Sequence, residues 1–434
     1  MSLYVDKPDT MQSEVVHILA SDLVPNAIYK LVLRLRHKFG THMSFAVFKA
    51  DSAGKIDVPR AKPLRGTYDE ADAMGLFMSV QPCDDFPYGA YLKCTPPLPF
   101  IYNLILLDSS CRELAMLPIK KHWMHPKLER TEIEEDGFCA TLFKPPGGLS
   151  WPFSSRFSST LCSAVQFKGS MLASEGFVVL CVAFFQYKNL VETLEEVEVE
   201  YFKKPINWLK RQTFTNDRLG IQGVSFGGTI VTILASRYSQ INAVVSINAP
   251  HVQNDYVNLL ENGKLLPHTV LPVQYAYFVN GIAATDKIIQ HVEVNDIAEI
   301  PWHRIPETTS FRLVASVDDL VSSSVFCSRY VSKRLVETEH NVEVHLVNGG
   351  HIMEPPYFPH HDKVYAKFQG FYCGYGGDVV LHGKSQEVSW AGTIDFFTRK
   401  LGQPAVLPEW KRLQHEDIKI RMRSVIPLWE EEEL

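Results

Sequence analysis

The chain has 434 residues, a length that favours about two domains rather than one small core. Hydrophobic residues make up 46% of it and charged residues 21%, which is the ordinary balance of a globular protein. The net charge of −6 argues against a general binder of nucleic acids or other polyanions, although a local basic pocket for a small anion is compatible with it.

Short strands are predicted for the first part of the chain, residues 1–135. The strand-like segments are rich in Val, Leu and aromatic residues, and turn-rich stretches such as KADSAGKID separate them. They lie at 29–37, 43–50, 74–82 and 102–110. Helical periodicity is nearly absent there, so we expect a β-sandwich.

A different pattern begins after the charged stretch KLERTEIEEDG at 127–137. Apolar strands are predicted at 176–185, 219–225, 241–248, 311–317 and 342–348, and amphipathic helices at 192–212, from 227 onward and at 322–338. This alternation predicts a mostly parallel sheet with helices on both faces, over residues 136–402. The charged remainder, 403–434, is expected to be a peripheral helix with an acidic end.

The stretch LGIQGVSFGG contains a serine between glycines, at the junction of a predicted strand and a predicted helix. Gly223, Ser225 and Gly227 form the pattern G-x-S-x-G, in which the serine occupies a tight, strained turn and is exposed as a nucleophile. An accidental match in an ordinary strand–turn–helix is the alternative. Because the motif falls where an α/β-hydrolase would place it, Ser225 is the candidate nucleophile.

A serine nucleophile needs a histidine as base and a carboxylate to orient that histidine. In α/β-hydrolases both follow later strands, in the order Ser, acid, His. His351 follows the predicted strand VEVHLVN through two glycines. By contrast, His340, His360, His361 and His382 lie in polar surroundings and are expected at the surface.

Two adjacent carboxylates, Asp318 and Asp319, follow the strand FRLVASV. The catalytic acid usually occupies the first loop position, with an apolar residue three positions later. Asp318 followed by Val321 fits that spacing, so Asp318 is the preferred acid. Asp319 would then be a helix N-cap or a solvated neighbour.

The eight cysteines are scattered through apolar stretches, and none forms a C-x-x-C pair. This distribution predicts buried free thiols in a reducing compartment, without a disulfide framework or a metal site. The start has neither an apolar signal core nor an Arg-rich leader, and no apolar run has the length of a membrane span. The expected location is therefore cytoplasmic.

Longer segments resemble the acyl-CoA thioesterases related to bile acid-CoA:amino acid N-acyltransferase. The resemblance covers about residues 10–402 and rests on KIDVPRAKPLRGTYDEADAMGLFMSVQP, MLASEGFVVLCVAFFQY, VEYFKKPINWL, GVSFGG, YGG and, most specifically, GGHIMEPPYFP. It implies an immunoglobulin-like β-sandwich followed by an α/β-hydrolase domain. It also implies an acyl-CoA substrate and a triad of Ser225, Asp318 and His351.

The mechanism that the resemblance implies needs no metal or bound cofactor, because coenzyme A is the leaving group. Serine favours hydrolysis of the acyl group, whereas the conjugating transferase carries cysteine, so transfer to an amino acid is the alternative. The backbone N–H of Phe226 is the expected first donor of the oxyanion hole. A carboxylesterase or dienelactone hydrolase would share the triad but has no need of the β-rich first part.

One stretch departs from the family's pattern, SWPFSSRFSSTLCSAVQFKG at 150–169. The family has an apolar strand and a glycine-rich turn there, which supplies the second oxyanion donor, whereas this stretch is serine-rich and has no glycine before Gly169. Three interpretations are open. The backbone supplies the donor without glycine; the oxyanion hole is damaged, leaving a weak enzyme or a non-catalytic acyl-CoA-binding relative; or the gene has been misread over this stretch.

Overall fold

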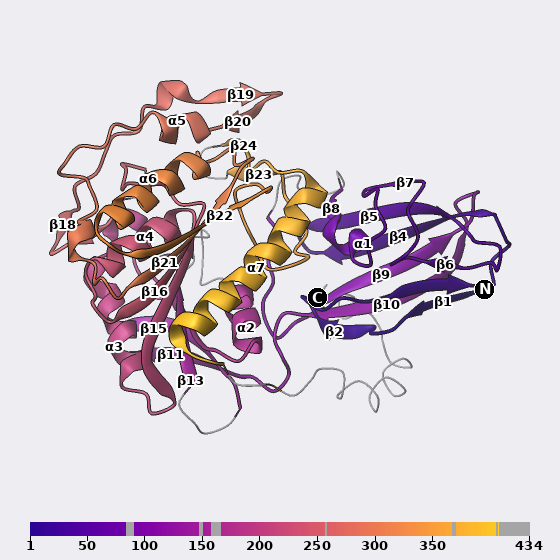
Figure 1. The fold of residues 1–434 in the computed structure, drawn as a ribbon, viewed down its shortest axis with the longest axis horizontal. Coiled ribbons are helices and arrows are strands. Elements are labelled where there is room, and N and C mark those ends of the chain that lie inside the picture. Colours follow the sequence, from indigo (N-terminus) through magenta and orange to yellow (C-terminus); the bar gives the residue numbers. More distant parts are fainter. Residues whose placement is uncertain are drawn as a thin grey trace.

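The computed structural model describes residues 1–83, 91–146, 151–157, 166–256, 258–366, 370–404 and 407, with backbone only for 151–157 and 366. Two units lie side by side, a β-rich unit built from the start of the chain and a larger unit of strands and helices (Figure 1). The expected peripheral helix over 403–434 lies almost wholly outside the described residues.

Two sheets form the first unit. One contains β1 (Ser2–Val5), β3 (Ile18–Ser21) and β6 (Ile56–Asp57) in the order β1-β3-β6. The other has the order β2-β10-β9-β4-β5-β7, with β8 (Gln81–Pro82) paired to β5. Its strands are β2 (Asp9–Met11), β10 (Glu113–His122), β9 (Phe100–Leu107), β4 (Ile28–His37), β5 (Gly40–Lys49) and β7 (Arg65–Gly66). Apolar side chains of both sheets meet in one core, including Ile18, Ile56, Leu33 and Leu104.

Three of the four predicted strands of this unit are confirmed, as β4, β5 and β9. Their alternation has a physical cause, because β4 and β5 bury every second side chain over part of their length. The expected strand at 74–82 is wrong. Its first half is the short helix α1 (Gly75–Met78), whose four residues are all buried, and only its end pairs, as β8.

An eight-stranded sheet forms the second unit, in the order β11-β12-β14-β13-β15-β16-β21-β22. The strands are β11 (Glu129–Glu135), β12 (Phe138–Lys144), β14 (Val178–Ala183), β13 (Trp151–Phe157), β15 (Thr215–Val224), β16 (Ile241–Ile247), β21 (Ser310–Ser316) and β22 (Asn341–Val347). The six strands from β14 to β22 in this order run parallel to one another. At one edge, β12 pairs antiparallel with β14, and β11 pairs antiparallel with β12. The predicted mostly parallel sheet is confirmed.

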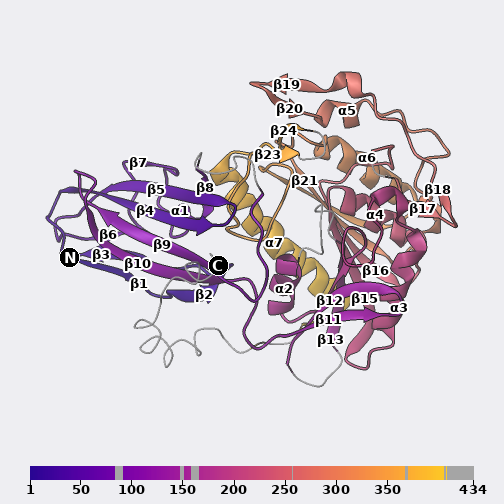
Figure 2. The ribbon, with the colours of Figure 1, turned by 180° about the vertical axis from the view of Figure 1, so that it is seen from behind.

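Helices cover both faces of this sheet. α2 (Gln166–Ser174) and α7 (Val379–Leu401) pack on the face toward the first unit (Figure 2), while α3 (Lys203–Lys210), α4 (Phe226–Ala235) and α6 (Ser324–Glu337) pack on the other. The predicted helices at 227 onward and at 322–338 are confirmed as α4 and α6. A sheet buried on both faces explains the apolar runs of its strands, since every residue of β14 is buried.

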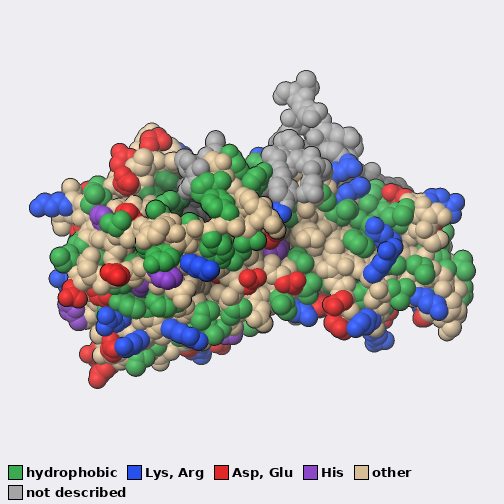
Figure 3. Space-filling view, turned by 90° about the horizontal axis from the view of Figure 1, so that it is seen from above, with side chains coloured by type: hydrophobic (Ala, Val, Ile, Leu, Met, Phe, Trp, Pro, Cys, Tyr) green, Lys and Arg blue, Asp and Glu red, His purple; other side chains and the backbone are tan. Residues whose placement is uncertain are grey.

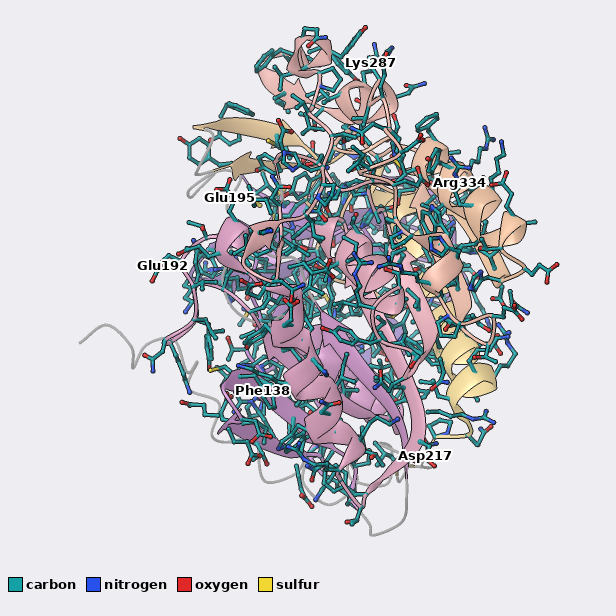
Figure 4. The ribbon with its side chains drawn as sticks, turned by 90° about the vertical axis from the view of Figure 1, so that its left-hand side faces the viewer. Phe138, Glu192, Glu195, Asp217, Lys287 and Arg334 are labelled. Carbon is teal, nitrogen blue, oxygen red and sulfur yellow. The ribbon has the colours of Figure 1, made fainter. Side chains whose placement is uncertain are left out.

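The chain between β16 and β21 rises above the carboxyl edge of the sheet. It carries β17 (Leu260–Glu261), β18 (Lys264–Leu265), η3 (Val273–Tyr275), β19 (Tyr277–Val279), β20 (Ile282–Ala284), α5 (Asp286–Gln290) and η4 (Trp302–Arg304). β19 and β20 share a small sheet with β24 (Phe371–Gly374) and β23 (Lys363–Ala366). Figure 4 places Lys287 of α5 at one end of the unit and Asp217, near the start of β15, at the other.

Two expectations about this unit need correction. The long helix predicted at 192–212 is the 3₁₀ turns η1 (Leu194–Glu196) and η2 (Val199–Phe202) followed by α3, and Figure 4 labels Glu192 and Glu195 in this segment. β11 pairs with β12, so the larger sheet already includes residues that precede the expected domain boundary at 135. The boundary between the sheets lies between His122 and Glu129.

The second correction concerns SSRFSS, which its serine content made a poor candidate for a central strand. Residues 151–157 form β13, paired in parallel with β14 on one side and β15 on the other. Backbone hydrogen bonds to two apolar neighbours therefore override the weak propensity of the segment itself. The residues that follow, 158–165, lie outside the described residues.

One apolar core joins the two units. It extends from the sheets of the first unit through Trp123 and Phe358 to Phe167 of α2 and Phe396 of α7. Trp123 is completely buried and meets the rings of Phe100, Phe167 and Phe358 at centroid distances of 5.1, 5.1 and 5.6 Å. The first unit is therefore fixed against the face of the sheet that carries α2 and α7.

Within the described residues all seven cysteines are free thiols, but only Cys94, Cys181 and Cys327 are buried as expected, and Cys111 is exposed. The helices of the described part of the chain include none that is long and apolar enough to cross a membrane. On the face that Figure 3 shows, basic and acidic side chains are interspersed, so this face has no extended field of one sign.

Candidate active site

Ser225 lies at the junction of β15 and α4, in the sharp turn that the glycine pattern predicts. Its backbone has φ 55° and ψ −130°, a conformation that is strained for any residue other than glycine. The amide of Ser225 donates to the carbonyl of Ile247 at 2.7 Å, and its carbonyl accepts from the amide of Gly228 at 2.8 Å. These bonds hold the strained turn and leave the half-buried hydroxyl at the carboxyl edge of the sheet.

Gly223 allows the strand to turn so closely into the helix. A Cβ at this position would lie 2.0 Å from the carbonyl oxygen of Gly227, which is backbone and cannot rotate away. The G-x-S-x-G pattern is therefore required by the close approach of β15 to the first turn of α4.

We expect Gly223→Ala to lower the free energy of unfolding by about 1–3 kcal/mol through this overpacking, and to lower kcat by displacing Ser225. Gly263→Ala is the control, because Gly263 has φ +71° but nothing within 4 Å of an added Cβ. It should cost about 1–2 kcal/mol in stability and leave kcat unchanged. Urea unfolding and steady-state kinetics on both variants measure this, and equal kcat values would contradict the explanation.

His351 lies between Ser225 and a carboxylate. Its Nε2 is 2.7 Å from the Ser225 Oγ, and its Nδ1 is 2.9 and 3.0 Å from the two carboxylate oxygens of Asp319. An ionised carboxylate only accepts hydrogen bonds, so Nδ1 carries the proton and Nε2 is left to accept from the serine hydroxyl. His351 is 2% exposed and Asp319 6%, so the pair is shielded from water.

The structure corrects the expected acid, because Asp319 rather than Asp318 faces His351. Pairing with the neighbouring chain segment continues beyond the end of β21, with Val317 N bonded to Val347 O at 2.9 Å and Asp318 N to Gly349 O at 3.2 Å. The loop therefore begins later than the sequence suggests. Asp319 is the first residue to turn over the sheet edge, whereas Asp318 is exposed.

Backbone and side-chain donors hold Asp319 in this orientation. Its Oδ1 accepts from the amides of Val321 and Ser322 at 2.8 and 2.9 Å, and its Oδ2 accepts from the hydroxyl of Ser324. Asp318 has a different partner, since its Oδ2 accepts from the amide of Gly377 at 2.8 Å. Asp318 thus ties the 375–377 turn to this loop instead of touching His351.

Two residues that the sequence analysis did not consider as part of the site hold the backbone of His351. Asn248, directly after β16, donates from Nδ2 to the His351 carbonyl at 2.6 Å and accepts from the Ser316 amide at 2.8 Å. The carbonyl of Tyr375 accepts from the His351 amide at 2.7 Å. An asparagine immediately after the buried strand INAVVSI is the signal that could have identified the first of them.

Phe226, the expected oxyanion donor, lies at the start of the helix that follows Ser225. It is the first residue of α4, and the first amides of a helix have no intrahelical carbonyl to bond. The second expected donor belongs to the stretch 150–169, whose residues 158–165 lie outside the described residues.

The histidines expected at the surface are in fact buried. His340, His360, His361 and His382 are 6%, 5%, 5% and 3% exposed. Two of these buried rings have backbone hydrogen-bond partners. His360 Nε2 lies 2.9 Å from the Gly377 carbonyl, and His382 Nδ1 accepts from the Gly350 amide at 3.0 Å. Polar neighbours in the sequence did not reveal this, because the partners come from distant loops.

Burial lowers the pKa of His361 and His382 well below the ordinary value, and neighbouring histidines add to the effect. Below pH about 6.5 the unfolded chain binds protons that the folded protein does not, so the free energy of unfolding should fall as the pH falls. Each such histidine contributes up to about 1.4 kcal/mol per pH unit below that value.

Urea unfolding between pH 7.5 and 5.5 measures this slope. His382→Asn keeps an acceptor for the Gly350 amide but cannot take up a proton, so it should show a shallower slope than the wild type. An identical slope in the variant would contradict the assignment.

Two family models match the chain. "BAAT / Acyl-CoA thioester hydrolase C terminal" matches residues 197–403, and "Acyl-CoA thioester hydrolase/BAAT N-terminal region" matches residues 13–135. Among solved structures, a putative dienelactone hydrolase from Klebsiella pneumoniae covers 63% of this chain and 98% of its own at 13% identity, with a TM-score of 0.38.

Similar curated proteins cover nearly the whole chain. Rat acyl-coenzyme A thioesterase 1 is 28% identical over 90% of this chain and 94% of its own, and mouse peroxisomal succinyl-coenzyme A thioesterase is 27% identical over 90% and 94%. Mouse acyl-coenzyme A amino acid N-acyltransferase 1 is 28% identical over 93% of this chain and 98% of its own. Since two models of one family match most of its length, the chain belongs to the family of acyl-CoA thioester hydrolases and bile acid-CoA:amino acid N-acyltransferases.

Proposed function

We propose that this protein is an acyl-CoA thioesterase, which hydrolyses a thioester to a free acid and coenzyme A through Ser225, His351 and Asp319. The observation that carries the proposal is the row of contacts from Ser225 Oγ to His351 Nε2 at 2.7 Å and from His351 Nδ1 to the Asp319 carboxylate at 2.9 Å. This is the arrangement by which a hydroxyl becomes a nucleophile at neutral pH.

In the acylation step, Ser225 Oγ attacks the thioester carbonyl while His351 Nε2 takes the hydroxyl proton. Asp319 stabilises the imidazolium that forms, and the Phe226 N–H donates to the oxyanion. The C–S bond then breaks, and His351 returns the proton to the leaving sulfur. The product of this step is an acyl ester on Ser225.

In the deacylation step, His351 takes a proton from water as the water oxygen attacks the ester carbonyl. Collapse of the second tetrahedral intermediate breaks the bond to Ser225 Oγ, which regains the proton from His351. The free acid leaves. In both steps the oxyanion forms at the same position. Because an oxyanion hole typically has two donors, we propose that the 150–169 stretch supplies the second.

A serine ester favours water as the acceptor, because an oxygen ester is less activated than a thioester toward an amine. Transfer to an amino acid is the second candidate, since two N-acyltransferases of mouse, 28% and 26% identical to the chain, are among its relatives. We also propose that the two-sheet first unit is immunoglobulin-like, as the family resemblance implies, and that it supports the loop after His351.

The test is thiol release from acyl-CoAs of several chain lengths by the purified protein, with products identified by mass spectrometry in the presence and absence of glycine and taurine. We expect thiol release with free acid as the only acyl product. An N-acyl amino acid would instead show a transferase. Retained acyl-CoA binding without any release would show a catalytically impaired relative with a damaged oxyanion hole.

A further inference from the structure

A buried ion pair lies next to the loop that carries His351. Lys168 in the first turn of α2 meets the Oε2 of Glu354, and both side chains are only 2% exposed. Removing two charges from water is expensive, and an apolar pair of similar volume is often as stable or more stable. Stability alone therefore does not explain why the fold buries this pair.

Glu354 has a second partner, Tyr91, which precedes β9 in the first unit. Tyr91 donates from its hydroxyl to the other oxygen of Glu354, Oε1, at 2.6 Å. Glu354 follows His351 by three residues, in the segment HIMEPPYFP. Tyr91, Glu354 and His351 also line the same small cavity.

α2 and Tyr91 contact this loop at a second residue, Phe358. Its ring stacks on Phe167, the neighbour of Lys168, with a centroid distance of 5.2 Å and an interplanar angle of 12°. On the other side it stacks on Tyr91 at 5.7 Å and 21°. The first unit adds a further contact, because Gln12 donates from Nε2 to the Tyr357 carbonyl at 2.7 Å.

α2 provides a rigid base for Lys168. A Cβ at Gly169 would lie 2.1 Å from the Sγ of Cys181, so the helix rests directly on β14. Ser170 also anchors the helix, because its hydroxyl donates to the Trp123 carbonyl at 2.6 Å. Lys168 therefore has little freedom to follow the Glu354 loop if that loop shifts.

From these contacts we propose that Lys168, Glu354 and Tyr91 are positioning residues. They fix the 351–358 loop so that His351 Nε2 stays within hydrogen-bond distance of Ser225 Oγ. They act on His351 through the backbone of this loop rather than by contact with the reacting hydroxyl. The inference rests on the proposed function of Ser225 and His351. Because misplacement by about 1 Å is enough to lower a rate about 100-fold, a loose loop should be costly.

Labelling of Ser225 by a fluorophosphonate tests this, since it reports the activated hydroxyl without depending on the acyl-CoA chosen. Lys168→Met leaves Glu354 buried without its cation, so we expect a lower Tm and slower labelling. In Lys168→Met/Glu354→Met both charges are gone, and Tm should return to within a few degrees of the wild type. Labelling and kcat in this double variant should stay about 10- to 100-fold below the wild type, with KM unchanged.

The outcomes separate positioning from a merely structural role. A double variant that regains both Tm and labelling rate would overturn the proposal. If it does not fold, Tyr91→Phe serves instead, because it keeps the ring on Phe358 and removes only the hydroxyl. Slower labelling at unchanged Tm supports the proposal, and an unchanged rate overturns it.

Glu70→Gln is the control for loss of a carboxylate, since Glu70 pairs with Lys62 on the surface and both side chains are more than half exposed. It should label at the wild-type rate. A wild-type protein that is not labelled at all would overturn the proposed function itself, and this inference with it.

Discussion

Replacing Ser225 with alanine is expected to abolish acyl-CoA thioesterase activity, with kcat falling by roughly 10⁴- to 10⁶-fold. The hydroxyl that lies 2.7 Å from His351 Nε2 forms the acyl ester in the proposed mechanism, and neither His351 nor Asp319 replaces it. The remaining activity would come from the Phe226 N–H and substrate binding alone.

The measurement is thiol release by Ser225→Ala and wild type under identical conditions, together with Tm and acyl-CoA binding. Both of the latter should be close to wild type, because the turn is held by backbone bonds of residue 225 that alanine retains. Activity within tenfold of the wild type would show that another group attacks the thioester. A collapsed Tm would make the loss of activity uninformative, so the binding measurement accompanies it.

The second large effect separates two adjacent carboxylates. Asp319→Asn is expected to lower kcat by about 10⁴-fold, because an amide whose NH₂ faces His351 selects the wrong tautomer of the imidazole. In Asp318→Asn the side-chain amide still presents an oxygen to the Gly377 N–H, so kcat should change by no more than a few-fold.

Steady-state kinetics on the two variants measure this difference directly, with Tm as the check on folding. The two substitutions are chemically identical and one residue apart, so each is the control for the other. A large loss in Asp318→Asn and a small one in Asp319→Asn would contradict the structure and restore the acid that spacing alone favours.

The parallel sheet and the strained G-x-S-x-G turn that carries Ser225 were predictable from local sequence patterns. Continuous apolar runs such as GFVVLCVAFF indicate strands buried on both faces, and β14 is one. Gly223 is required because it packs against Gly227, only four residues away, so this requirement is visible in a short sequence motif. His351 was predictable for the same reason, because only Asn348 and two glycines separate it from the end of β22.

The features that were missed depend on contacts between distant segments. Asp319 rather than Asp318 faces His351 because backbone pairing with 347–349 continues past the end of β21, which spacing does not reveal. β13 forms from a serine-rich segment because its two neighbours hold it. The burial of His360 and His382 depends likewise on loops that the fold brings together.

The central claim is that Ser225, activated by His351, carries the acyl group during turnover. The most direct measurement is inactivation by a fluorophosphonate, with thiol release from acyl-CoA and the extent of the adduct on the Ser225 peptide followed in the same sample. We predict that activity falls in proportion to modified Ser225 and reaches zero at one adduct per chain. Thiol release that persists after Ser225 is fully modified, or inactivation by an adduct on another residue, would contradict the claim.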